Sequence, residues 1–84
     1  MNLLFLDDAW EDYQYWMQTD KNTLKRINLL IKDCMRTPYS GIGKPEPLKF
    51  DLTGTWSRRI NQEHRLVYKV EQDKLIILQC RYHY

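Results

Sequence analysis

Near the N-terminus a short apolar stretch is followed by apolar residues at helical spacing. This pattern predicts a short strand and then a helix. Asn2–Leu6 is a short apolar stretch and predicts the strand. Asp7 or Asp8 then supplies a side-chain N-cap for a helix that ends near Thr19.

The first predicted helix carries an aromatic stripe, because Trp10, Tyr13 and Met17 recur at helical spacing with Trp16 beside them. Apolar periodicity is first of all a burial signal, so we expect this stripe to face the core. A platform for base stacking is the alternative interpretation.

A second helix is predicted from Asp20 to Thr37, because Pro38 cannot continue it. Its buried face should hold Leu24, Ile27, Ile31 and Cys34. Its remaining surface is basic, with Lys21, Lys25, Arg26, Lys32 and Arg36. Such a surface is usually only solvated, and RNA binding is the alternative.

The second half of the chain predicts a loop and then a meander of strands. Tyr39–Pro47 holds two glycines and two prolines and predicts the loop. Strands are predicted at Leu48–Leu52, Thr55–Ile60, His64–Val70 and Lys74–Cys80, with turns at 53–54, 61–63 and 72–73. Helices and strands segregated in this way favour an α+β fold. We expect an N-terminal strand and two helices packed on one face of a mostly antiparallel four- to five-stranded sheet.

Composition indicates an ordinary globular protein, with 43% hydrophobic and 29% charged residues. Its 84 residues predict a single domain over 1–84. No apolar run approaches the roughly 20 residues of a membrane helix, and no secretion signal is recognisable, so we expect a cytoplasmic protein. Cys34 and Cys80 lack metal-ligand spacing and should be buried thiols.

Charge is distributed unevenly along the chain. The net charge is +2, but residues 1–20 contain five acidic residues and no Lys or Arg, so residues 21–84 carry +7. A basic C-terminal portion suits a polyanion such as nucleic acid.

Alternation in the strand predicted at His64–Val70 leaves Arg65 on the sheet face away from the helices. The helix-facing side chains would be Leu66, Tyr68 and Val70. The turn at 61–63 can place Arg59 opposite Arg65, and two adjacent guanidiniums are unfavourable without an anion. The pair predicts a phosphate site, with two unrelated solvated arginines as the alternative.

Glu46 lies between Pro45 and Pro47, which restrict the backbone and can fix where its carboxylate points. Neighbouring cations in the sequence favour its ionised form, which a general base needs. The alternative is a rigid turn with a bystander glutamate.

The chain ends in Arg81-Tyr82-His83-Tyr84, which can contact phosphate, stack on bases and move a proton. Arg81 and His83 share one face of an extended strand, but the parity of the preceding turn decides whether Arg65 shares it. A frayed terminus is the alternative. RNA cleavage through the 2′-hydroxyl without metal requires a base, cations and an acid, which Glu, Arg and His can supply. Their spacing alone does not specify a ribonuclease.

Four motifs in one order resemble the Txe/YoeB toxins of the RelE/ParE superfamily. They are GKPEPLK at Gly43–Lys49, LTGTWSRRI at Leu52–Ile60, EHRLVY at Glu63–Tyr68 and RYHY at Arg81–Tyr84. The resemblance implies a RelE-like, microbial-RNase-like fold and a ribosome-dependent endoribonuclease toxin of a type II toxin-antitoxin system that cuts messenger RNA in the A site.

By this resemblance Glu46 is the general base, His83 the general acid and Arg65 the arginine that stabilises the transition state. Substrate- or phosphate-binding positions would be Tyr84, Lys49, Arg59, Lys44 and Arg58. The resemblance implies neither a metal nor another cofactor.

The implied partners are a Phd/YefM-type antitoxin, the 70S ribosome with its messenger RNA, and a second copy in a homodimer. Operator DNA would be contacted only through the antitoxin complex, and no membrane contact is expected. Two other functions stay open on the residues alone. One is a non-catalytic basic module that binds nucleic acid, and the other is a receptor for the antitoxin peptide.

Overall fold

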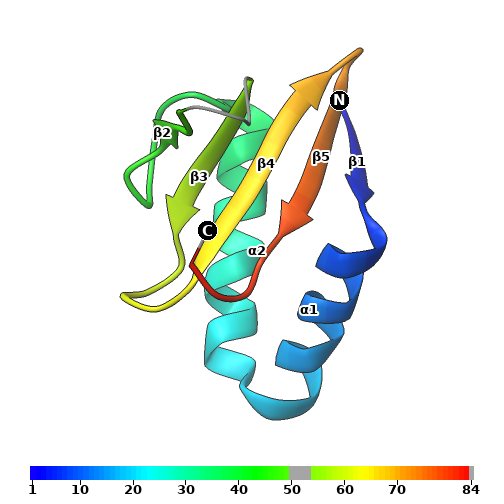
Figure 1. Cartoon of the computed structure of the whole chain (residues 1–84), viewed down its shortest axis with the longest axis vertical. Coiled ribbons are helices and arrows are strands. Elements are labelled where there is room, and N and C mark those ends of the chain that lie inside the picture. The colour runs from blue at the N-terminus through cyan, green and yellow to red at the C-terminus, as the bar shows by residue number, and fades with distance from the viewer. Residues whose placement is uncertain (50–53, 84) are drawn as a thin grey trace.

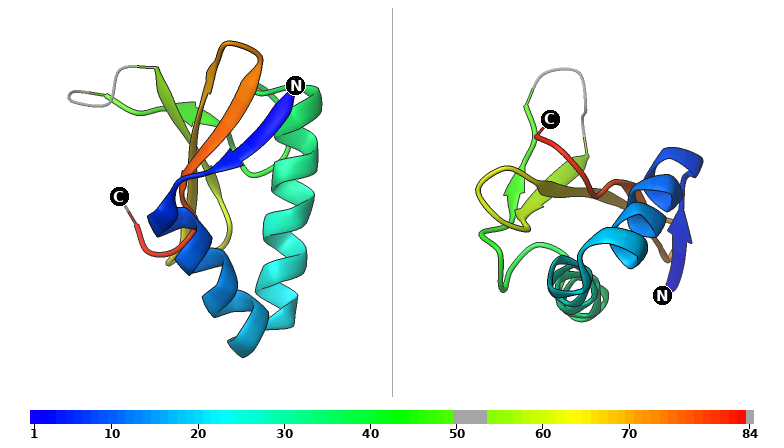
Figure 2. Two further views of the ribbon diagram at one scale, coloured as in Figure 1. Left: turned by 90° about the vertical axis from the view of Figure 1, so that its right-hand side faces the viewer. Right: turned by 90° about the horizontal axis from the view of Figure 1, so that it is seen from below.

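The computed structural model describes residues 1–49 and 54–83. Its elements are β1 (Asn2–Phe5), α1 (Asp7–Thr19), α2 (Lys21–Arg36), β2 (Glu46–Pro47), β3 (Thr55–Arg59), β4 (Arg65–Glu71) and β5 (Lys74–Gln79). The strand order is β1-β5-β4-β3-β2, with β1 parallel to β5 and the other pairs antiparallel. Both helices pack on one face of this sheet (Figures 1 and 2). The predicted α+β fold is confirmed, and the described residues form a sheet of five strands.

The strand predicted at Leu48–Leu52 is wrong where the structure describes it. The residues that pair are Glu46 and Pro47, while Leu48 and Lys49 lie outside any strand and 50–52 lie outside the described residues. Pro47 pairs with Trp56 of β3 at the outer edge of the sheet. An edge strand tolerates proline because one side of it needs no ladder hydrogen bonds.

The stripe predicted for α1 is confirmed only in part, because Trp16 is buried and Tyr13 packs against the core while Trp10 and Met17 do not. The buried side chains are Ala9 and Trp16, whereas Trp10 is 44% and Met17 39% exposed. Tyr13 is only partly buried against the core. Hydropathy misled the prediction, because the inward side of α1 includes a small residue and a carboxylate. The Asp12 Oδ2 accepts a hydrogen bond from the Cys80 N–H at 3.1 Å.

The N-cap of α1 differs from the prediction as well. Leu6 occupies the cap and makes no side-chain cap hydrogen bond. Asp7 and Asp8 lie in the first turn instead, where negative side chains interact favourably with the helix dipole.

The prediction for α2 is confirmed. Asp20 is its N-cap, and its Oδ1 accepts hydrogen bonds from the N–H groups of Asn22 and Thr23, both at 3.1 Å. Ile27, Leu30, Ile31 and Cys34 are buried, and Leu24 packs against them. No helix among the described residues is long and apolar enough to cross a membrane.

Both cysteines are buried, as predicted. Burial raises the pKa of the Cys34 thiol to about 11 and that of Cys80 to about 12. Both side chains therefore stay protonated and act as small apolar core residues.

The hairpin between β4 and β5 turns at Gln72 and Asp73, which have φ angles of 50° and 60°. Two successive positive φ angles are typical of a two-residue type I′ turn. The β4–β5 register shifts between Val67 and Tyr68, so that Tyr68 pairs with Ile77 and Val67 with Gln79. This shift, together with the end of β5 at Gln79, decides the path of the C-terminal residues.

Replacing Asp20 tests the capping of α2. Asp20→Ala should lower the free energy of unfolding by about 1 kcal/mol, because the N-cap acceptor is lost. Asp20→Asn keeps a side-chain oxygen and should cost much less. Urea unfolding of the three proteins measures both values, and equal losses in the two variants would contradict the capping role.

Candidate active site

Strand pairing brings three of the predicted site residues to one face of the sheet. Glu46 pairs with Ser57, and Arg59 pairs with Arg65. Paired residues of antiparallel strands share a face, and so do residues two apart in one strand. Glu46, Arg59 and Arg65 therefore share one face. The opposite face holds the buried Leu66 and Tyr68 that pack under the helices.

Arg65 faces away from the helices as predicted, but it is only 8% exposed rather than openly solvated. Its Nη1 donates to the carbonyl oxygens of Asn61 at 2.6 Å, His64 at 3.1 Å and Gln62 at 3.3 Å. Carbonyl dipoles of its own hairpin thus hold the guanidinium in place. This gives a positive charge whose position is set before any ligand arrives.

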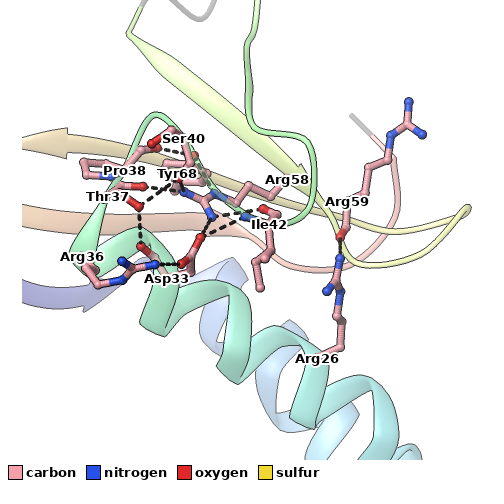
Figure 3. A network of polar contacts seen from close by, with 10 residues as sticks. All are labelled: Arg26, Asp33, Arg36, Thr37, Pro38, Ser40, Ile42, Arg58, Arg59 and Tyr68. Carbon is pink, nitrogen blue, oxygen red and sulfur yellow. Dashed lines mark hydrogen bonds and ion pairs between the residues drawn. The ribbon is translucent and has the colours of Figure 1, made fainter.

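A shallow groove of about 310 Å³ opens at the Arg65 end of the sheet, lined by Arg26, Arg59, Ile60, Asn61, Gln62 and Arg65. Arg26 reaches from α2, and its Nη2 donates to the Arg59 carbonyl at 3.1 Å. Figure 3 shows the Arg59 side chain extending away from that contact. Three arginines around one groove make it a strongly positive surface, suited to phosphate.

The C-terminal segment returns to the same end of the sheet after β5. The Arg65 N–H donates to the Tyr82 carbonyl at 2.9 Å, and the Tyr82 N–H donates to His64 Nδ1 at 2.7 Å. Figure 2 shows this segment, residues 80–83, on the side of the sheet away from α2. The exposed His83 follows Tyr82 directly.

Arg81 and His83 do not continue a strand, because β5 ends at Gln79. The Arg81 guanidinium lies over the Tyr15 ring, 3.5 Å from its centroid, and 4.6 Å from the centroid of Tyr82. This cation–π contact ties Arg81 to α1.

Arg58 corrects the predicted set, because its side chain is completely buried and cannot contact an RNA backbone. Its Nη1 pairs with Asp33 Oδ2 at 2.6 Å, and its Nε donates to the Tyr68 hydroxyl at 3.2 Å. Its other acceptors are the carbonyl oxygens of Thr37, Ser40 and Ile42 (Figure 3). Arg58 therefore fixes the loop that connects α2 to β2.

Tyr68 and Asp33 complete this buried network. The Tyr68 hydroxyl donates to the Pro38 carbonyl at 2.6 Å, and burial raises the pKa of Tyr68 to about 12. Hydrogen bonds from Arg58, Arg36 and the Ile42 N–H lower the pKa of Asp33 to about 2. Asp33 is therefore ionised at neutral pH and balances the buried guanidinium.

The remaining predicted residues lie on or beside β2 or at the chain end. Lys44 and Lys49 are exposed, and Lys44 has a positive φ of 52°. Gly43 just before it is fixed to β3, because its carbonyl accepts from the Arg59 N–H at 2.7 Å. Tyr84 lies outside the described residues. No cluster of three or more potential metal ligands occurs among residues 1–49 and 54–83.

A model of the family described as YoeB-like toxins of bacterial type II toxin-antitoxin systems matches residues 5–84. The chain belongs to this family. Toxin YoeB of Escherichia coli strain K12 is 60% identical over 84 residues, covering 100% of both chains.

Solved YoeB structures agree with this assignment. The YoeB dimer from Staphylococcus aureus is 52% identical, with a TM-score of 0.93 over 100% of this chain and 98% of the other. YoeB in the heterotetrameric YoeB-YefM complex from the same organism is 52% identical, with a TM-score of 0.91 over the same shares. The predicted RelE-like fold is thus confirmed for this YoeB-family chain.

Sequence reasoning missed Asp33 and misplaced Arg58 in this YoeB-family site. The alternation of side chains that was applied to β4 also applies to β3, and it could have located Arg58. Neighbouring residues of a strand, such as Arg58 and Arg59, point to opposite faces of the sheet. Since Arg59 lies on the outer face, Arg58 had to point toward the helices. Its partner Asp33 is 25 residues away in sequence, and no local pattern indicates that contact.

The two arginines that contact Asp33 provide a matched test of this network. Arg58→Ala should lower the free energy of unfolding by about 3–5 kcal/mol, because a buried charge and several carbonyl groups lose their partner. Arg36→Ala removes a largely exposed arginine from the same carboxylate and should cost less than about 1 kcal/mol. Chemical denaturation followed by circular dichroism measures both, and equal losses would argue against a buried Arg58.

The pH dependence of stability should report Asp33. Its pKa of about 2 lies below the ordinary 3.8, so its contribution is complete above pH 3.8 and is lost as the pH falls toward 2. Asp33→Asn should therefore show a flatter decline of unfolding free energy across that range. The exposed Glu11→Gln variant is the control, and an unchanged slope in Asp33→Asn would contradict the pairing.

Proposed function

We propose that this YoeB-family chain is a metal-independent endoribonuclease that cuts messenger RNA in the A site of the 70S ribosome and so inhibits translation. The observation that carries the proposal is the shared outer face of Glu46, Arg59 and Arg65, with Tyr82 hydrogen-bonded to β4 at Arg65. That contact brings His83 to the same end of the sheet. This arrangement supports a site in which Glu46 is the proposed base, Arg65 the proposed cation and His83 the proposed acid.

The reaction follows from the chemistry of these three groups. Glu46 takes the proton of the 2′-hydroxyl, and the 2′-oxygen attacks the adjacent phosphorus. Arg65 stabilises the negative charge that builds on the phosphorane, from a position already fixed by its hairpin. His83 donates a proton to the departing 5′-oxygen. The products are a 2′,3′-cyclic phosphate and a 5′-hydroxyl, and neither metal nor cofactor takes part.

Binding of the RNA backbone is assigned to basic residues around this face. Arg59 lines the groove beside Arg65, while Lys44 and Lys49 are exposed beside β2. Each can neutralise a phosphate, which makes binding salt-dependent. Tyr84 is proposed to help orient the substrate. Arg58 is left out because it is buried.

The proposed partners follow from the family and from the S. aureus structures. We propose a Phd/YefM-type antitoxin as the inhibitor, since a solved relative forms a complex with YefM. We also propose a homodimer, since a solved relative is a dimer. The pair would bind operator DNA only through the antitoxin, and the toxin would act in the cytoplasm on translating ribosomes.

Cleavage on programmed ribosomes in the presence of chelator tests the proposal. Glu46→Gln, Arg65→Ala and His83→Gln should each lower the cleavage rate by about 10²–10⁴-fold, because each removes a proton-transfer or charge-stabilising group. Mapping the messenger ends should give A-site cuts with a 5′-hydroxyl and a cyclic or 3′-phosphate. Circular dichroism checks that each variant is folded.

Glu71→Gln is the carboxylate control, because Glu71 is exposed at the other end of β4. It should cut at the wild-type rate. Tight, salt-dependent ribosome binding by the wild type without cleavage would favour a non-catalytic RNA-binding module. The absence of both binding and cleavage would favour a receptor for the antitoxin peptide.

A further inference from the structure

We propose that His64 is a positioning residue of this site, whose imidazole anchors the C-terminal segment so that His83 is presented beside Arg65. The inference rests on the proposed function, since it assigns His64 a role in placing the proposed general acid. His64 acts through the backbone of Tyr82 and is not itself a catalytic residue.

Two consecutive residues hold both polar backbone groups of Tyr82. His64 Nδ1 accepts a hydrogen bond from the Tyr82 N–H at 2.7 Å, and the Arg65 N–H donates to the Tyr82 carbonyl at 2.9 Å. Tyr82 has a φ of 68°. A non-glycine residue adopts this conformation only where its surroundings hold it there. The two hydrogen bonds, one accepted by His64 and one donated by Arg65, hold Tyr82 in this conformation.

The imidazole is itself fixed in position. Its ring meets the edge of the buried Trp16 indole at a centroid distance of 4.8 Å and an interplanar angle of 78°. The His64 N–H donates to Asn61 Oδ1 at 2.8 Å, which sets the backbone beneath the ring. The acceptor nitrogen is thus preorganised by contacts that do not involve the C-terminal segment.

Trp16 also holds the segment directly. Its Nε1 donates to the Cys80 carbonyl at 2.8 Å. The residues just before His83 are therefore tied at Cys80 by the indole and at Tyr82 by the imidazole that packs on that indole. Gln79 Nε2 adds a hydrogen bond to the Arg81 carbonyl at 2.9 Å. Because the backbone is held at these three residues, the position of the His83 backbone is constrained.

The two histidines of the chain need different protonation for their proposed roles. An imidazole nitrogen that accepts a hydrogen bond carries no proton, so His64 acts with its proton on Nε2. His83 must instead donate a proton in the proposed reaction. An asparagine places its side-chain oxygen near the position of Nδ1, whereas a glutamine amide extends toward that of Nε2. Comparing the Asn and Gln variants therefore separates the effect of an acceptor at the Nδ1 position from the effect of side-chain size.

Single-turnover cleavage on saturating programmed ribosomes tests the inference with His64→Asn, His64→Gln and His64→Ala. The Asn variant should cut within about 3-fold of wild type, while Gln and Ala should lose about 10²-fold in rate constant, the scale of a misplaced catalytic group. The ribosome concentration for half-maximal rate should not change, because His64 does not bind RNA. Thermal unfolding identifies any variant that fails to fold.

Hydrogen exchange of the Tyr82 amide, measured by NMR, provides a readout independent of cleavage. The amide should be protected in wild type and His64→Asn and should exchange faster in the Gln and Ala variants. Folded Gln and Ala variants that cut at the wild-type rate would overturn the inference, and so would a protected Tyr82 amide in the Ala variant. A wild type without cleavage but with this exchange pattern would overturn the proposed function while supporting the anchor.

Discussion

The buried ion pair between Arg58 and Asp33 is the interaction on which the arrangement of the site depends. A guanidinium with no exposed surface is costly unless its donors find acceptors, and here they are supplied by α2, β4 and the loop after α2. The same bonds that satisfy the charge therefore close that loop onto the sheet. Gly43, at the end of the loop, is hydrogen-bonded to Arg59, and β2 with Glu46 follows.

A second set of hydrogen bonds attaches the C-terminal segment, residues 80–83, to the rest of the fold. Trp16 holds Cys80, and both His64 and the first residue of β4, Arg65, hold Tyr82. A segment outside regular structure is therefore attached to both α1 and β4. Glu46 and His83 both belong to segments with little regular structure of their own. Each is placed by side chains that hydrogen-bond to backbone groups. A thin two-layer fold of this size can thus position two candidate site residues from irregular segments without a large core.

Prediction from the sequence succeeded where the pattern is local. The periodicity of α2, its stop at Pro38 and the alternation of β4 all correspond to the structure, and the 61–63 turn placed Arg59 opposite Arg65. It failed where the partner is distant. Trp10 and Met17 have the hydropathy of core residues but lie at the surface. The side of α1 that faces inward is set by the hydrogen bonds of Trp16 and Asp12 to the Cys80 backbone. Periodicity in the sequence cannot indicate such long-range contacts.

The sequence by itself determined the family, the order of helices and strands, and the candidate residues Glu46, Arg65 and His83, because motifs and alternation are properties of neighbouring positions. Only the tertiary structure decided that Arg58 is internal, that Arg65 is held by its own hairpin, and that the chain after β5 returns to β4. Those outcomes depend on hydrogen bonds between residues far apart in sequence, such as Arg58 with Asp33 and His64 with Tyr82. The burial of a charge or the path of a terminus is set by which acceptors the packed fold brings within reach.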